Sequence, residues 1–186
     1  MPISTAQFKT GMAIQHDGKR WIIIDFQHVK PGKGAAFVRT KLKELESGRV
    51  NDYTFRAGEK FDDVRVEKRA MQYLYNDGDT YYFMDNDTYE QVEMDADFVG
   101  DAKQWLKEND EATVLTADGD YLGVEAPMFV ELEVTETEPG FKGDTVNSSG
   151  KPAVVETGAA VTVPNFVEIG DVVKIDTRDG RYVTRV

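Results

Sequence analysis

The chain of 186 residues contains no cysteine and only two histidines. The absence of cysteine excludes a disulfide framework, a thiolate zinc site and a cysteine nucleophile. His16 and His28 are too few for a multi-histidine metal site, so we expect no metal or other cofactor. No run reaches the roughly 18 consecutive apolar residues of a membrane span, and the first ten residues lack the pattern of a secretory signal. We therefore expect a cytoplasmic protein with no membrane partner.

Catalytic motifs are also missing from the sequence. GxSxG, HExxH and the phosphate-binding GxxxxGK[ST] pattern do not occur. Carboxylates are abundant between residues 85 and 97, but Asp is favoured in turns because it hydrogen-bonds the local backbone. The spacing does not fit an EF-hand loop. A small hydrolase or metal enzyme is thus a weak hypothesis, and we expect a protein that is not an enzyme.

The net charge of -12 is distributed unevenly along the chain. Residues 1–65 have 12 Lys and Arg against 8 Asp and Glu, whereas residues 66–126 have 4 against 16 and residues 127–186 have 6 against 10. An acidic surface repels phosphate, so only the first third of the chain is suited to contact a polyanion.

Turn sequences recur between runs rich in Val, Ile, Tyr, Phe and Thr, and they include Asp17-Gly18, Asp77-Gly78, Asp118-Gly119 and Asp179-Gly180. Such turns predict a series of antiparallel hairpins. The clearest helix candidate is 97–108, with Asp97 as its cap. The charge balance changes from basic to acidic near residue 65, and a proline interrupts two strand-like runs near residue 126. We therefore predict an all-β chain of three small barrels, 1–65, 66–126 and 127–186, each of a size typical of SH3-like or OB folds.

The first candidate for function is the loop Lys30-Pro31-Gly32-Lys33-Gly34-Ala35-Ala36 between two strand-like runs. The flanking glycines Gly32 and Gly34 leave Lys33 as the one long side chain at the apex. A solvated lysine on a flexible turn is the simpler interpretation. The alternative is a narrow finger that brings a cation, or a modified lysine, into a confined negative site.

The strand after this loop alternates Arg39, Lys41 and Lys43 with apolar or small residues. A period of two places the three cations on one face. That face is either simply solvated or, together with Lys30, a contact surface for RNA phosphates.

Five segments together resemble bacterial elongation factor P from end to end: VKPGKGAAF, YLYNDGD, FMDNDTYEQ, TEPGFKGDT and GDVVKIDTRDGRYVTRV. The resemblance implies an N-terminal SH3-like (KOW-type) domain followed by two OB-fold domains, in an L-shaped arrangement like that of a tRNA. It also implies a monomeric translation factor that binds the 70S ribosome between the peptidyl and exit tRNA sites. There the factor relieves stalling at consecutive prolines by positioning peptidyl-tRNA.

The same resemblance assigns roles to individual residues. Lys33 corresponds to the family's tip residue, which a separate lysine-modifying enzyme extends in many members. Gly143, Asp144 and Thr145 match the family loop that approaches the exit-site codon of the mRNA, although Phe141 stands where Leu or Ile is common. Ribosomal RNA and peptidyl-tRNA are the other partners that the resemblance implies.

Two alternatives stay open on the sequence. One is the elongation factor P-like paralogue, although the tip KPGKGAAF favours the main factor. The other is a general binder of single-stranded nucleic acid that uses its OB folds, for which the acidic middle segment is unfavourable.

Overall fold

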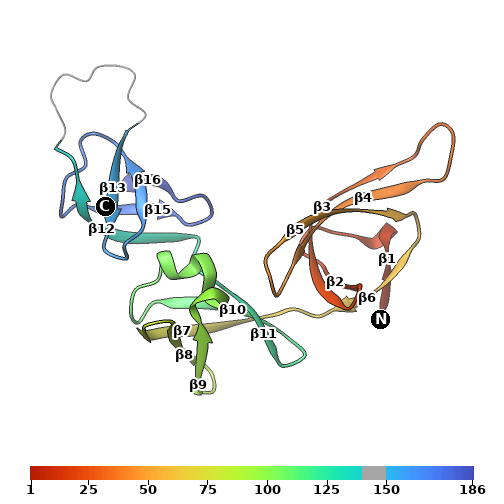
Figure 1. Cartoon of the computed structure of the whole chain (residues 1–186), viewed down its shortest axis with the longest axis horizontal. Coiled ribbons are helices and arrows are strands. Elements are labelled where there is room, and N and C mark those ends of the chain that lie inside the picture. The colour runs from red at the N-terminus through yellow and green to blue at the C-terminus, as the bar shows by residue number, and fades with distance from the viewer. Residues whose placement is uncertain (140–149) are drawn as a thin grey trace. The chain divides into compact units, whose positions relative to one another are not determined.

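The computed structural model describes residues 1–139 and 150–186, and it is built almost entirely of strands in three sheets (Figure 1). The all-β prediction is therefore confirmed. By internal contacts the residues form two compact units, one of Met1–Arg69 with Val114–Gly123 and the other of Ala70–Thr113 with Val124–Val186. The division into domains 1–65, 66–126 and 127–186 stays a prediction.

The first sheet is antiparallel throughout, in the order β1-β6-β2-β3-β4-β5. Its strands are β1 (Pro2–Ser4), β2 (Ala13–His16), β3 (Lys19–Val29), β4 (Phe37–Glu44), β5 (Val50–Arg56) and β6 (Lys60–Val64), and a short 3-10 turn, η1 (Thr5–Gln7), follows β1. The β2–β3 hairpin turns at Asp17 and Gly18, whose φ angles of 50° and 74° fit a tight two-residue turn. This confirms the hairpin predicted there.

The core of the first sheet combines aliphatic and aromatic side chains. Trp21, Phe55 and Phe61 are buried, and the Phe55 and Phe61 ring centroids are 4.6 Å apart in an edge-to-face arrangement. His16 packs edge-on against this cluster, 5.1 Å from the centroid of Phe55. This histidine is therefore part of the packing of the barrel.

The second sheet has the order β11-β10-β7-β8-β9. Its strands are β7 (Glu67–Asp77), β8 (Thr80–Asp85), β9 (Gln91–Asp95), β10 (Glu111–Ala117) and β11 (Asp120–Glu125). The turns at Gly78 and at Asp118-Gly119 join consecutive strands, as predicted.

Within the first compact unit, Ala117 and Leu122 pack with Ala13, Leu45 and Val64. Arg20 bridges Glu46 and Asp120 at 2.7 and 3.0 Å. These two hydrogen bonds raise the pKa of Arg20, with Glu46 contributing most.

The helix predicted over 97–108 is wrong in length and start. One α-helical turn, α1 (Ala96–Val99), is followed by a 3-10 helix, η2 (Gly100–Gln104). The cap is Asp95, whose carboxylate accepts a hydrogen bond from the Asp97 N–H at 2.8 Å. Gly100 has a φ of +59°, outside the helical range, and ends the α-helix.

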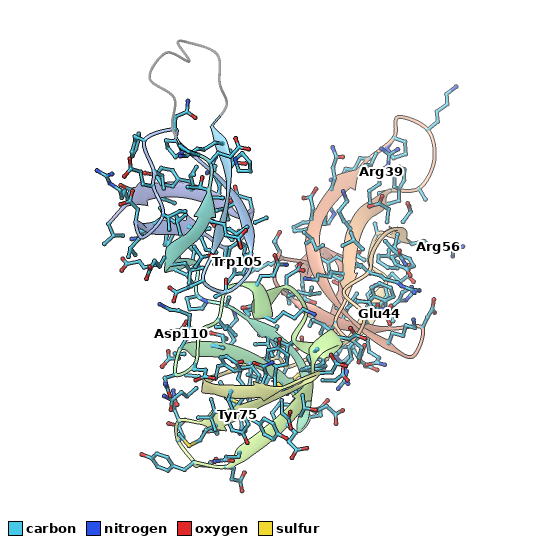
Figure 2. The ribbon with its side chains drawn as sticks, turned by 60° about the vertical axis from the view of Figure 1, so that its left-hand side comes forward. Arg39, Glu44, Arg56, Tyr75, Trp105 and Asp110 are labelled. Atoms are coloured by element: carbon cyan, nitrogen blue, oxygen red, sulfur yellow. The ribbon has the colours of Figure 1, made fainter. Side chains whose placement is uncertain are left out.

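The third sheet is antiparallel throughout, in the order β14-β13-β12-β15-β16. Its strands are β12 (Phe129–Thr137), β13 (Lys151–Val155), β14 (Ala160–Val163), β15 (Val172–Asp176) and β16 (Arg181–Arg185). Trp105, which follows η2, is 6% exposed and belongs to the core of this sheet (Figure 2). Lys107 also reaches Glu156 at 3.3 Å. Ala102, Trp105 and Leu106 are thus buried although the helix is not continuous, whereas Phe98 is half-buried.

Candidate functional site

The loop 30–36 closes the long β3–β4 hairpin, which extends from the first sheet as an arm (Figure 1). Lys30, Gly32, Lys33 and Gly34 are exposed and Pro31 is half-buried. Among the residues that the structure describes, the Lys33 ammonium takes part in no ion pair. The loop thus presents the lysine to solvent, where it is free to contact another molecule.

The alternation predicted for the strand after the loop is confirmed. In β4, Arg39, Lys41 and Lys43 are exposed, whereas Val38 and Leu42 are fully buried. The apolar side chains anchor β4 in the core, and each intervening residue must then point outward. Arg39 lies on the arm below the loop (Figure 2). The three cations therefore form one outward row, which we call the β4 cation row.

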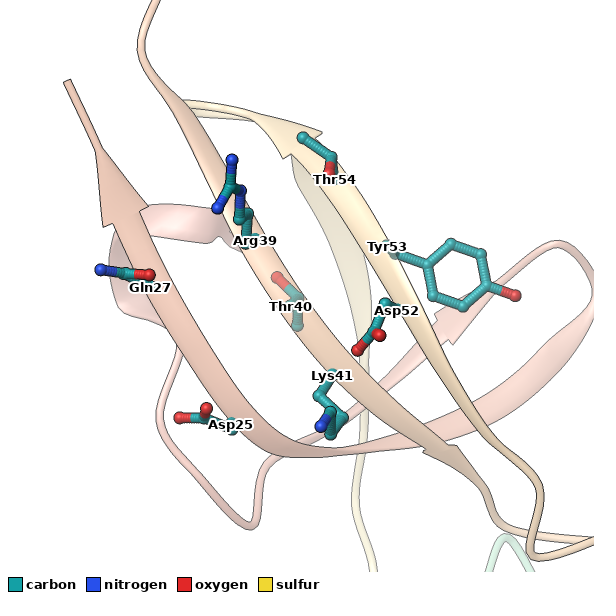
Figure 3. Close-up of a pocket in the computed structure, with 8 residues that line it drawn as sticks. All are labelled: Asp25, Gln27, Arg39, Thr40, Lys41, Asp52, Tyr53 and Thr54. Atoms are coloured by element: carbon teal, nitrogen blue, oxygen red, sulfur yellow. The ribbon is translucent and has the colours of Figure 1, made fainter. Parts of the chain in front are cut away.

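Each cation of this row has different neighbours on the adjacent strands. Arg39 lies opposite Gln27 of β3 and Thr54 of β5, and its guanidinium is 5.7 Å from the centroid of the Phe37 ring. Lys41 lies opposite Asp25 and Asp52. These side chains line a shallow hollow of about 310 Å³ on the outside of the sheet (Figure 3).

Lys43 is placed between Ile22 and Val50, so no carboxylate faces it from either adjacent strand. The next residue, Glu44, points inward, and its carboxylate accepts a hydrogen bond from Lys19 at 2.9 Å. That bond is the main reason why the pKa of Glu44 is lowered. Glu44 is thus already paired within the barrel.

Sequence reasoning missed Asp25, Asp52, Gln27 and Thr54 as parts of this surface. The signal that could have found them is strand register, since residues opposite one another in a hairpin share a face. The register cannot be counted from the loop alone, because β3 contains a bulge between Ile23 and Asp25.

The other predicted loop, Gly143, Asp144 and Thr145, lies outside the described residues. Within residues 1–139 and 150–186, no group of three or more His, Asp and Glu side chains is arranged to hold a metal ion. No helix in these same ranges is long and apolar enough to cross a membrane.

Comparison with protein families accounts for almost the whole chain. Residues 4–61 match the model of the elongation factor P KOW-like domain, residues 66–124 the elongation factor P OB domain, and residues 130–185 the elongation factor P C-terminal domain. The chain belongs to the elongation factor P family. The resemblance inferred from the motifs is confirmed, as are the KOW-like first domain and the OB-type second domain.

Curated relatives match this chain along nearly the full length of both sequences. The chain is 54% identical to elongation factor P of Acetivibrio thermocellus over 184 residues, which cover 99% of this chain and 100% of the relative. It is 55% identical to elongation factor P of Moorella thermoacetica over 183 residues, 98% and 99% of the two chains. Both relatives are named as elongation factor P itself. The protein is therefore a translation elongation factor.

A solved structure shares the fold at lower identity. Translation initiation factor 5A from Methanococcus jannaschii superimposes with a TM-score of 0.55 at 24% sequence identity, covering 65% of this chain and 90% of that one. This similarity indicates a common arrangement of strands.

Proposed function

We propose that this elongation factor binds the 70S ribosome between the peptidyl and exit tRNA sites and stimulates peptide-bond formation at consecutive prolines. The observation that carries the proposal is Lys33, which is exposed at the end of an arm and forms no ion pair within residues 1–139 and 150–186, in a member of this family. A lysine flanked by glycines is narrow enough to enter a crowded RNA cavity beside the end of peptidyl-tRNA.

The proposed contribution is orientation. Proline is a constrained nucleophile, so a peptidyl-tRNA that leaves its reactive geometry lengthens each pause. Holding the two reactants in place lowers the barrier without any proton transfer by the factor. The ribosome stays the catalyst, and the factor itself is not an enzyme.

RNA phosphates are the proposed partners of the basic first domain. Lys30, Arg39 and Lys43 are exposed, and no carboxylate faces Arg39 or Lys43 on the adjacent strands. Each phosphate that such a cation neutralises releases counterions, so binding weakens as salt is raised. Lys41 differs from these cations because a carboxylate lies opposite it on each adjacent strand.

We also propose that the loop with Gly143, Asp144 and Thr145 contacts the mRNA at the exit-site codon. The factor acts as a cytoplasmic monomer.

A separate enzyme is proposed to extend Lys33. The chemistry of that extension is left open. Intact mass of the protein from its native cell tests the last point, because an unmodified chain gives the mass of the sequence alone.

The proposal is tested by co-sedimentation with 70S ribosomes and by translation of paired reporters that differ only in a run of prolines. We expect the factor to sediment with ribosomes and to accelerate only the proline reporter. The double variant Asp144→Ala with Thr145→Ala should lose acceleration while keeping its Tm. Tight binding to free single-stranded RNA with no reporter specificity would instead favour the general nucleic-acid binder.

A further inference from the structure

The centre of the β4 cation row differs from its two ends. Lys41 lies directly opposite Asp25 on β3 and directly opposite Asp52 on β5. Directly opposed residues of antiparallel strands have Cβ atoms about 4.5–5.5 Å apart. Lys41 is therefore flanked by a carboxylate on each side, and the three charges together sum to one negative charge.

Local backbone structure holds Asp25 in this position. Ile23 pairs with Leu42, but Ile24 is the extra residue of the bulge, so Asp25 rather than Ile24 comes opposite Lys41. One carboxylate oxygen of Asp25 also accepts a hydrogen bond from the Phe26 N–H at 2.9 Å. Figure 3 shows Asp25, Lys41 and Asp52 in a row across the three strands.

The two other cations have no such neighbours. Arg39 faces the neutral side chains of Gln27 and Thr54 across the strands, and Lys43 faces Ile22 and Val50. A phosphate that approaches Arg39 or Lys43 meets a cation that has no carboxylate directly opposite it. A phosphate over Lys41 meets two carboxylates well within the Debye length of about 8 Å at physiological salt.

We propose that Asp25 and Asp52 neutralise Lys41 and thereby weaken the attraction of the first domain for RNA phosphates, leaving Arg39 and Lys43 as the contacts of the row. This inference rests on the proposed RNA-binding role of the first domain. The ligand is the phosphodiester backbone of RNA. Repulsion at the centre of the row disfavours polyanions that cannot place phosphates at its two ends. The two carboxylates therefore select among polyanions by repelling those with the wrong phosphate spacing.

The test removes the two carboxylates without changing side-chain shape. The double variant Asp25→Asn with Asp52→Asn keeps an oxygen that can accept from the Phe26 N–H. Its affinity for a short blunt-ended RNA duplex is measured by fluorescence anisotropy over a range of salt. We expect affinity to rise about 3-fold or more at low salt, and the slope of log affinity against log salt to steepen by about 0.7–0.9 as Lys41 gains a phosphate.

A matched control separates local charge from net charge. Asp62 and Asp63 are exposed on β6, which is separated from β4 by β2 and β3 in the sheet order. Changing both to Asn alters the net charge by the same amount as the double variant at Asp25 and Asp52. It should raise RNA affinity by less than about 1.5-fold, because distant exposed charges are screened. An equal rise in both double variants would overturn the proposal.

A second arm of the test follows Lys41 itself. Lys41→Ala should change RNA affinity less than about 2-fold in the native background but several-fold in the background with Asn at 25 and 52, a coupling that a double-mutant cycle measures. An equal loss in both backgrounds, matching that of Arg39→Ala, would show Lys41 to be an ordinary contact. Because these measurements use RNA without ribosomes, failure of the proline-stalling experiment and failure of this inference are distinguishable.

Discussion

Two hairpin loops of this chain each carry a cation close to a glycine, and their surroundings are opposite. The loop between β3 and β4 has Lys33 between two glycines, and the loop between β15 and β16 has Arg178 followed by Asp179 and Gly180. Lys33 pairs with nothing among the described residues. Arg178 donates to both carboxylate oxygens of Asp176, with its Nε at 2.9 Å from Oδ1. A cation near a loop apex is thus free for another molecule in one case and used internally in the other.

The glycines of the two loops also differ in how closely other residues surround them. Gly34 has a φ of +110° and Gly180 a φ of +71°, a region that side chains with a Cβ rarely adopt. A Cβ on Gly180 would lie 3.5 Å from the buried Trp105 ring, whereas a Cβ on Gly34 would meet only Pro31 at 3.9 Å. The β15–β16 loop therefore belongs to a packed surface and the β3–β4 loop to an exposed arm. Packing around a turn thus decides whether its residues serve stability or recognition.

The largest effect is expected from Lys33→Ala. The variant should lose most of the acceleration on a consecutive-proline reporter, while the free energy of unfolding changes by less than about 0.5 kcal/mol, because the side chain has no buried contact to lose. Paired reporters and thermal melting measure the two quantities. Full acceleration by the alanine variant would remove Lys33 from the mechanism and leave the loop as a shape element.

Lys33→Arg sharpens this result. Arginine keeps the positive charge but presents a planar guanidinium that a lysine-modifying enzyme should not extend. Acceleration retained by the arginine variant would indicate that simple charge suffices. Loss in both variants, with an added mass on native Lys33, would indicate that the extended lysine is the active form.

The next effect is on stability and compares Gly180→Ala with Gly34→Ala. At Gly180 the φ of +71° opposes a side chain, and the methyl group would touch the indole at an ordinary contact distance of 3.5 Å, so we expect a loss of about 1 kcal/mol in the free energy of unfolding from the backbone. Gly34→Ala is also opposed by its φ of +110°, but the exposed arm can relax, so we expect a smaller loss of Tm together with reduced acceleration on the proline reporter. Chemical denaturation of both variants checks this, and equal Tm losses would contradict the contrast between the loops.

The smallest effect is a pH dependence confined to the second loop. The hydrogen bonds from Arg178 lower the pKa of Asp176 to about 2. A carboxyl group whose pKa is depressed by folding stabilises the fold above its unfolded value near 4, and the contribution is lost as pH falls toward the folded value. The Tm of the native protein should therefore exceed that of Asp176→Asn near neutral pH and converge with it between about pH 4 and pH 2.

Calorimetry across this pH range measures the difference. Asp171, whose pKa is lowered chiefly by a backbone hydrogen bond from Glu168 and further by Arg185, is present in both proteins and cancels in the comparison. A Tm difference that is constant down to pH 2 would show that the carboxylate charge of Asp176 contributes no stability.

Much of the fold could be predicted because its signals are local. Asp17-Gly18 and Asp118-Gly119 tolerate positive φ and form the expected turns, and alternation in β4 places its cations outward. The helix prediction failed because apolar spacing cannot show where an α-helix gives way to a 3-10 helix. The α-helix ends where Gly100 adopts a φ of +59°, and Trp105 beyond the 3-10 helix is buried in the core of the third sheet.

The sequence by itself determined the strand-rich architecture, the basic first domain, the exposed lysine between glycines and, through its motifs, the family. These follow from residue type, spacing and period, each of which acts over a few neighbouring residues. Only the tertiary structure decided that Asp25 and Asp52 flank Lys41 and that Arg178 forms an ion pair with Asp176. The bulge at Ile24 shifts β3 by one residue, and because side chains alternate between faces, that single shift exchanges an apolar neighbour of Lys41 for a carboxylate.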